Sequence, residues 1–316
     1  MGIRNYDLQN SRIYVAGHTG MVGSACLREL KKSGFKNIVY KSSAELDLRN
    51  QLDVEKFISS SNIDIVIDAA ARVGGILANN SNPFEFLMDN ILIQSNLINS
   101  SFRNKIKKFV FLGSSCIYPK LAPQPIKESY LLSGPLEPTN EWYAIAKISG
   151  LKMIEALKKQ YNMNYYSLMP TNLYGPNDNF DLKTSHVLPA MIRKFHDAKL
   201  NNNSDVVLWG TGTPMREFLH VDDLAKAIVF SLKNNISDSL LNVGTGKDIT
   251  IKELALLIQE IIGHKGKIIW DTSKPDGTPK KLLDISKIND YGWSPNISLK
   301  KGIKQTLDWY KKQKIK

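Results

Sequence analysis

The chain has 316 residues, of which 42% are hydrophobic, and it carries a formal net charge of +12. This length exceeds that of one typical domain and predicts a sizeable core with a second, smaller lobe. The basic excess comes from lysines scattered along the chain and from the tail 311–316, and no nucleic-acid module accompanies it. We therefore expect no nucleic-acid partner.

The longest apolar stretch, 63–78, contains three charged residues, so no segment is expected to span a bilayer. The first residues show neither a signal-peptide core nor the serine of a myristoylation motif. Two cysteines, Cys26 and Cys116, are too few for a disulfide framework and lack metal-ligand spacing. These features predict a soluble, cytoplasmic protein without a bound metal.

The first elements form a strand, glycine turn and helix unit. A buried strand, 12–16, runs into Gly17, Gly20 and Gly23 and then into a helical pattern that ends near residue 33, and a second strand follows at 37–40. Glycines so spaced allow a tight turn and close approach of the backbone to a pyrophosphate at the helix N-terminus. The pattern is G-x-x-G-x-x-G rather than the G-x-G-x-x-G of many dehydrogenases, but its position predicts a dinucleotide site.

Strands at 63–67, 108–112 and 165–169 alternate with helices at 83–103 and about 141–160. Such alternation predicts an α/β fold, a Rossmann-type doubly wound parallel sheet covered on both faces. We assign residues 1–175 to this dinucleotide-binding domain. Residues 176–316, with shorter mixed elements at 206–210, 222–232, 251–262 and 299–312, should form a smaller α/β substrate lobe, with some chain returning to the first domain. The ligand cleft should lie between the lobes, at the carboxyl ends of the strands.

Tyr143 and Lys147 lie four residues apart in the predicted helix 141–160, so they share one face. Thr139 and Asn140 stand where their side chains can cap this helix. An ammonium near a phenol favours the phenolate, and such a pair can give a proton to a carbonyl oxygen. The spacing is common by chance, so the neighbouring motifs decide its meaning.

Ser114 and Cys116 follow the strand 108–112 at the edge where a ligand would be met. Alternate residues of an extended segment share a face, so both side chains can point into one cavity. A serine hydroxyl there can hold a substrate oxygen that Tyr143 protonates as hydride arrives. Lys147 can hold the nicotinamide ribose.

The glycine motif, Ser114, Tyr143 and Lys147 together resemble the extended short-chain dehydrogenase/reductase family. The runs 112–119, 170–176 and 214–223 resemble, more narrowly, the GDP-L-fucose synthase family. This resemblance implies NADPH-dependent conversion of GDP-4-keto-6-deoxy-D-mannose to GDP-L-fucose, by epimerisation at C3 and C5 and then reduction at C4. It also implies a homodimer.

The same resemblance implies Cys116 as the epimerisation base and His186 as the acid. A C4 ketone acidifies the protons on both neighbouring carbons, and inversion needs proton removal from one face and delivery to the other. We expect the polar, cation-bearing site to lower the pKa of Cys116, and histidine already titrates near neutrality. Without the motifs, Cys116 could equally be a small buried residue and His186 an ordinary surface histidine.

Substrate-binding residues are likewise implied by matching positions. Arg216 can bridge phosphate oxygens, whereas Lys194 stands where relatives often have arginine and acts only as a point charge. Trp209 could contact substrate or pack in a core. Asp276 completes the predicted set: Lys194, Trp209, Arg216 and Asp276.

The coenzyme is expected to be NADPH, with NADH possible. Lys41 could pair the extra phosphate of NADP, although Thr19 and Ser43 stand where some relatives carry arginines. Asp47 and Leu48 would lie near the adenine by resemblance. The predicted coenzyme residues are Gly17, Gly20, Met21, Val22, Gly23, Lys41, Asp47, Leu48, Leu112, Gly113, Ser114, Lys147, Pro170, Asn172, Leu173 and His186.

Three other functions can be compared with this one. Nucleotide-sugar 4,6-dehydratases place an Asp-Glu pair where this chain has Ser115 and Cys116, so the thiol disfavours them. A reductase that acts only at C4 of another GDP-4-keto sugar, such as a heptose, could carry identical motifs. A non-catalytic dinucleotide-sensing protein would be free to lose Tyr143 or Lys147, and both are present.

Overall fold

Within residues 8–314, which the computed structural model describes, six strands form one parallel sheet. In spatial order these are β2 (Ile38–Val39), β1 (Ile13–Ala16), β3 (Ile65–Asp68), β4 (Lys108–Leu112), β5 (Tyr165–Pro170) and β9 (Leu240–Val243). The strand order reverses between β1 and β3, and such a switch point opens a crevice at the carboxyl ends. The predicted Rossmann-type fold is confirmed.

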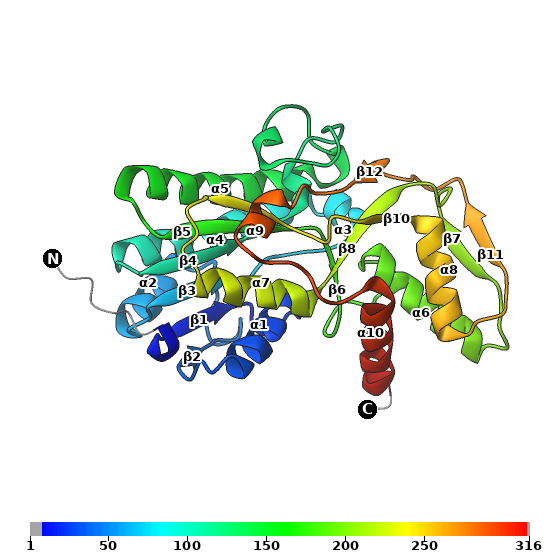
Figure 1. Cartoon of the computed structure of the whole chain (residues 1–316), viewed down its shortest axis with the longest axis horizontal. Coiled ribbons are helices and arrows are strands. Elements are labelled where there is room, and N and C mark those ends of the chain that lie inside the picture. The colour runs from blue at the N-terminus through cyan, green and yellow to red at the C-terminus, as the bar shows by residue number, and fades with distance from the viewer. Residues whose placement is uncertain (1–7, 315–316) are drawn as a thin grey trace.

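Helices cover both faces of this sheet, as Figure 1 shows. Every residue of β1, β3, β4 and β5 is buried, which explains their continuous apolar runs. One face carries α2 (Gln51–Ser60), α4 (Pro83–Arg103) and α5 (Glu141–Tyr161), and the other carries α1 (Met21–Lys32) and α7 (Val221–Lys233). Short α3 (Ile76–Ser81) and α9 (Ser286–Asp290) lie at the margins.

The smaller lobe has its own apolar core. Its main sheet joins β10 (Asp248–Thr250), β8 (Met215–His220) and β12 (Lys280–Lys281), and β6 (Asn172–Tyr174) also pairs with β8. A second pair consists of β7 (Val206–Trp209) and β11 (Ile268–Asp271). Around them pack α6 (Val187–Leu200), α8 (Ile251–Ile262) and α10 (Leu299–Lys314).

The chain passes between the lobes repeatedly. After β8 in the smaller lobe, α7 packs against α1 and β9 adds the edge strand beside β5 of the larger sheet. The chain then returns to the smaller lobe through β10 and α8. The division at residue 175 stays a prediction.

Helix α5 matches its predicted span closely, but its N-terminus is not capped as expected. Asn140 occupies the N-cap position, yet its side chain makes no capping hydrogen bond. The Thr139 hydroxyl donates instead to Oε1 of Glu137, at 3.3 Å. The expectation that these side chains cap the helix is therefore wrong, because the short 3-10 turn Pro138–Asn140 directs them elsewhere. No helix among the described residues has the length and apolarity of a membrane span.

Candidate functional site

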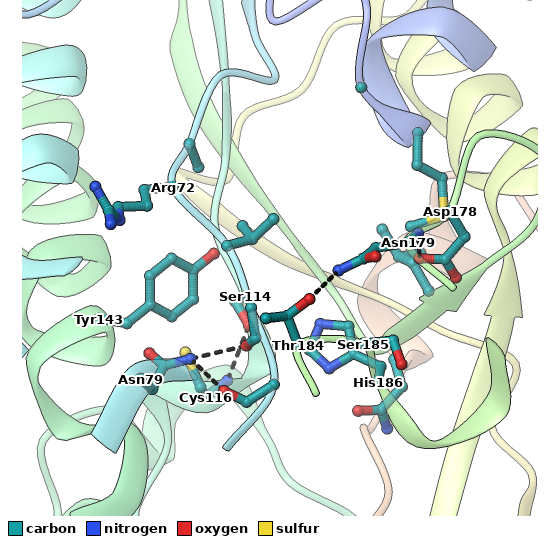
Figure 2. Close-up of a pocket in the computed structure, with 18 of the residues that line it drawn as sticks. Arg72, Asn79, Ser114, Cys116, Tyr143, Asp178, Asn179, Thr184, Ser185 and His186 are labelled. Carbon is teal, nitrogen blue, oxygen red and sulfur yellow. Dashed lines mark hydrogen bonds between the residues drawn. The ribbon is translucent and has the colours of Figure 1, made fainter. Parts of the chain in front are cut away.

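A cavity of about 1150 Å³ opens at the carboxyl ends of the large sheet and extends to the smaller lobe. Its walls bring together all five predicted catalytic residues, from three separate chain segments: Ser114, Cys116, Tyr143, Lys147 and His186. Figure 2 shows the Tyr143 hydroxyl and the Ser114 side chain directed toward the space that His186 borders from the opposite side. Distant parts of the sequence therefore meet around one volume.

The glycine turn forms one end of this cavity. Gly17 has φ +74°, and a Cβ there would lie 2.6 Å from the Ala69 carbonyl oxygen. A Cβ at Gly20 would have only the Gly17 carbonyl oxygen nearby, at 3.5 Å, and Gly20 is an N-cap without a side-chain hydrogen bond. An open backbone at a helix N-terminus fits a pyrophosphate. Gly23 does not line the cavity; a Cβ there would overlap Gly17, so its role is close packing.

The other predicted coenzyme residues all line the same cavity. Lys41, two residues after β2, is half-exposed and pairs with Glu45, its Nζ lying 3.2 Å from Oε1. Hydrogen bonds from Ser42 lower the pKa of Glu45 to about 2, so this carboxylate stays charged. Ser43 and Thr19 also line this end, and neither adds a charge. Lys41 is thus a cation already shared with a carboxylate.

The ammonium group of Lys147 is held in place by residues of β4. Its Nζ donates to the Leu112 carbonyl oxygen at 2.9 Å and lies 4.8 Å from the centre of the Phe111 ring. The expectation that this ammonium favours tyrosinate is not met, because burial raises the pKa of Tyr143 and nearby Cys116 and Asp68 raise it further. Tyr143 is therefore a neutral phenol at neutral pH, which suits a proton donor.

Ser114 and Cys116 are joined through the backbone. Ser114 caps a 3-10 turn, Ser115–Ile117, and its hydroxyl accepts a hydrogen bond from the Cys116 amide at 3.3 Å. Burial raises the pKa of the Cys116 thiol, and the positive charges of Lys281 and Lys147 only partly offset this. The expected lowering of the Cys116 pKa is therefore wrong, because desolvation outweighs the neighbouring cations.

His186 is the N-cap residue of α6. The loop before it is hydrogen-bonded to the loop after β3, which also lines the cavity. The Gly75 amide donates to the Thr184 carbonyl oxygen at 2.9 Å, and the Thr184 hydroxyl accepts from Nδ2 of Asn179 at 2.9 Å (Figure 2). His186 is accessible from the cavity, but the walls displace bulk water. This desolvation, with the charge of Lys281, lowers the pKa of His186.

The four predicted substrate residues lie at the far end of the cavity. Lys194 donates to the Val207 carbonyl oxygen at 2.8 Å, and Asp276 accepts from the amide and hydroxyl of Thr211 at 2.7 and 2.8 Å. Arg216 lies on β8 in the cavity wall. Trp209 is 51% exposed, so the alternative that it packs in a core is wrong.

Lys281 is a site residue that the sequence did not reveal. It lies on β12 as the register partner of Arg216, lines the cavity, and acts on both Cys116 and His186 through its charge. Glu137 and Asn140 line the same wall, and Oδ1 of Asn140 is buried without a partner among the described residues. No local spacing distinguishes Lys281 in so lysine-rich a chain; only the pairing of β12 with β8 places it here.

Both cysteines are free and buried, and residues 8–314 contain no group of three or more His, Cys, Asp or Glu side chains that could hold a metal. Cations dominate the half that faces the smaller lobe, where Lys194, Arg216 and Lys281 gather. An anionic ligand fits that half best.

Comparisons with known proteins agree with this geometry. The model of the NAD dependent epimerase/dehydratase family matches residues 13–244. The chain is 57% identical to a putative GDP-L-fucose synthase 2 of Arabidopsis thaliana over 302 residues, which covers 96% of this chain and 92% of that protein. It is 50% identical to the GDP-L-fucose synthase of Escherichia coli over 312 residues, which covers 96% and 97% of the two chains.

Solved structures give the same picture. MlghC, a GDP-mannoheptose C4 reductase from Campylobacter jejuni with NADP bound, superposes with a TM-score of 0.89 at 40% identity, over 98% of this chain and 100% of that one. A common backbone thus carries proteins named for hexose and for heptose sugars. The side chains around the cavity must account for the difference between them.

Proposed function

Because the chain belongs to the NAD dependent epimerase/dehydratase family and, within it, to the GDP-L-fucose synthases, we propose that it converts GDP-4-keto-6-deoxy-D-mannose to GDP-L-fucose. The observation that carries this proposal is the convergence of Ser114, Cys116, Tyr143, Lys147 and His186 on one cavity. This set supplies separate groups for proton removal, proton delivery and ketone protonation. The same five residues can therefore serve both epimerisation and reduction in one site.

In the epimerisation, the Cys116 thiolate removes the proton from C3 and then from C5, and His186 delivers a proton to the opposite face. The Ser114 hydroxyl holds the C4 oxygen, on which the enolate charge develops. Lys281 and Lys147 favour the Cys116 thiolate against the desolvation of its buried position. His186 borders the same space from the smaller lobe, so the two groups reach the sugar from different sides (Figure 2).

In the reduction, NADPH supplies the hydride that C4 receives. Tyr143 gives its phenolic proton to the C4 oxygen, for which its neutral state at neutral pH is suitable. The Ser114 hydroxyl keeps that oxygen in place. Lys147, held by its hydrogen bond to Leu112, holds the nicotinamide ribose with its remaining N–H groups.

The nucleotide end of the substrate is held by the cationic half of the cavity. The Arg216 guanidinium can take two phosphate oxygens at once, and Lys194 adds a single charge. Trp209, exposed in the cavity wall, offers a flat face for the guanine. Asp276 keeps the loop after β7 in position through its bonds to Thr211.

The coenzyme preference is for NADPH over NADH. Lys41 is the cation placed to meet the 2′-phosphate, and it must leave part of its interaction with Glu45 to do so. The preference should therefore be modest, and NADH should support turnover at higher concentration. The relative MlghC, whose structure holds NADP, supports this choice of coenzyme.

The protein is proposed to act in the cytoplasm as a homodimer. Exposed apolar side chains on neighbouring helices of the larger lobe, Leu92 on α4 and Trp142 and Ile145 on α5, offer a surface for a second copy. Light scattering should give twice the mass of one chain. Ile145→Glu should convert the dimer to a monomer. A wild type with the mass of one chain, or a dimer that Ile145→Glu leaves intact, would count against this assembly.

The function is tested by incubating the protein with NADPH and GDP-4-keto-6-deoxy-D-mannose in heavy water and examining the sugar by NMR. GDP-L-fucose with deuterium at C3 and C5 is the expected product. A product reduced only at C4, without deuterium, would reassign the protein to a C4 reductase, and GDP-4-keto-heptoses would be tested next. Coenzyme binding without turnover of any keto sugar would instead favour a dinucleotide-sensing protein.

A further inference from the structure

Asp68 is a buried acid that the reaction above does not use. It ends β3 directly beneath the cavity, because the next residues, Ala69 and Ala70, line the cavity wall. Its side chain is fully buried. Oδ1 accepts a hydrogen bond from the Ala70 amide at 3.2 Å, while Oδ2 has no hydrogen-bond partner within the described part of the chain. A buried carboxylate so poorly satisfied needs a compensating charge.

The strand register places Asp68 in the same layer as Lys147. Asp68 and Phe111 are partners in the parallel pair β3–β4, so their side chains project from the same face of the sheet. Helix α5 covers that face: a Cβ on Gly150 would lie 2.6 Å from the Phe111 ring. The Lys147 ammonium lies 4.8 Å from the centre of this ring. The carboxylate and the ammonium are therefore both enclosed between the sheet and α5.

Burial lowers the pKa of Lys147, and two negative groups, Asp68 and Cys116, act against that shift. Burial raises the pKa of the Cys116 thiol, so near neutral pH most of it is protonated and only a small fraction is the thiolate proposed as the base; its charge there is therefore minor. Asp68, whose pKa burial raises to about 6, is ionised above that pH. The other titratable groups that face Asp68 are Tyr14 on β1 and Tyr143 on α5, and both are neutral because burial raises their pKa values.

We propose that Asp68 is a positioning residue whose carboxylate keeps the Lys147 ammonium charged in its buried place. The inference rests on the proposed role of Lys147 in holding the nicotinamide ribose. A charged ammonium forms stronger hydrogen bonds to hydroxyl groups than a neutral amine does. Asp68 touches neither sugar nor coenzyme. By keeping Lys147 charged, it allows the coenzyme to be held at higher pH than Lys147 alone would allow.

The test measures the dissociation constant of NADP by calorimetry from pH 6 to 10, and therefore needs no keto sugar. In the wild type the affinity should fall at alkaline pH as Lys147 loses its proton. In both Asp68→Asn and Asp68→Leu, the midpoint of this loss of affinity should shift to lower pH by about one pH unit. The matched control is Asp89→Asn, which removes a carboxylate that lines the same cavity but pairs with Arg49 and Arg72. It should leave the alkaline fall in place.

Lys147→Met separates the two hypotheses. If the alkaline fall persists in Lys147→Met, then it does not belong to Lys147 and the proposed role of that lysine is wrong. If the fall vanishes in Lys147→Met but stays unmoved in a folded Asp68→Asn or Asp68→Leu protein, then the inference about Asp68 is overturned. The reciprocal measurement needs no change at Asp68: carboxyl ¹³C shifts should show its pKa rising in Lys147→Met.

Discussion

The Gly75 amide donates a 2.9 Å hydrogen bond to the Thr184 carbonyl oxygen, and so ties the loop after β3 to the loop that carries His186. The two loops come from different lobes. Their separation fixes how far His186 stands from the sheet edge where Ser114 and Cys116 lie. The relative placement of the proposed proton carriers, Cys116 and His186, thus depends on a contact between two backbones.

Gly75→Ala should disturb this contact, because a Cβ there would lie 2.8 Å from the Ser185 carbonyl oxygen. The displaced loop should move His186 and slow deuterium incorporation into the sugar by about 10²-fold. Binding of NADP should change little. The control is Gly134→Ala, whose Cβ would meet nothing closer than Pro119, at 3.4 Å. Equal exchange rates in the two variants would contradict this account.

Tyr143→Phe should lower the rate of C4 reduction by about 10²- to 10⁴-fold, because it removes the proton donor while leaving the ring in place. Deuterium exchange at C3 and C5 should continue, since Cys116 and His186 remain. Stopped-flow absorbance follows the reduction, and NMR follows the exchange. Reduction at the wild-type rate would rule Tyr143 out as the acid.

Lys281→Met should raise the pKa of both Cys116 and His186, because the positive charge of Lys281 lowers each of them. Both limbs of the pH profile for exchange should therefore move to higher pH. In a Cys26→Ser background, thiolate absorbance against pH reports Cys116 directly. The neighbouring Lys280→Met removes a lysine that instead pairs with Asp248 at 3.2 Å, and its profile should match the wild type.

Lys41→Ala should weaken NADPH binding by about tenfold and leave NADH binding almost unchanged, because the lost charge meets only the 2′-phosphate. Glu45→Gln should have the opposite effect on NADPH, since it frees the Lys41 ammonium from its partner. Fluorescence titration of the wild type and both variants with each coenzyme gives the six dissociation constants. Parallel losses for the two coenzymes would place Lys41 elsewhere in the binding site.

Ionisation of Asp68 should lower the free energy of unfolding of the protein as the pH rises. Its pKa is raised from 3.8 to about 6, so the folded chain retains a proton that the unfolded chain releases over this range. Between about pH 4.5 and 7.5 the loss should be about 2 kcal/mol. Asp68→Asn should gain about this much relative to the wild type, as urea unfolding at the two pH values would measure. A constant difference between the proteins would show that Asp68 titrates normally.

The sequence was informative where structure follows from local pattern. Buried strands such as β4 appear as unbroken apolar runs, and the turn at Gly17 needs a backbone conformation that glycine adopts most easily. Helix α5 could be placed to within a residue for the same reason. Motifs attached to such elements inherit their positions, which explains why Ser114 and Tyr143 could be expected at one cavity.

The sequence failed where the outcome depends on distant parts of the chain. Lys281 reaches Cys116 only because β12 pairs with β8. The pKa directions of Cys116 and Tyr143 were mistaken because burial, set by the packing of both lobes, exceeds the effect of nearby cations. Charges near a residue can be guessed from a motif, whereas the extent of its desolvation on burial cannot.

The repeated passage of the chain between the lobes limits how this protein can be divided. A fragment that stopped at residue 175 would lack β9 and would leave β5 as an open edge, ready to pair with other molecules. Neither lobe could therefore be exchanged with that of a relative as an independent module. New sugar specificities on this scaffold should arise through substitutions in the cavity walls, with the two lobes inherited together.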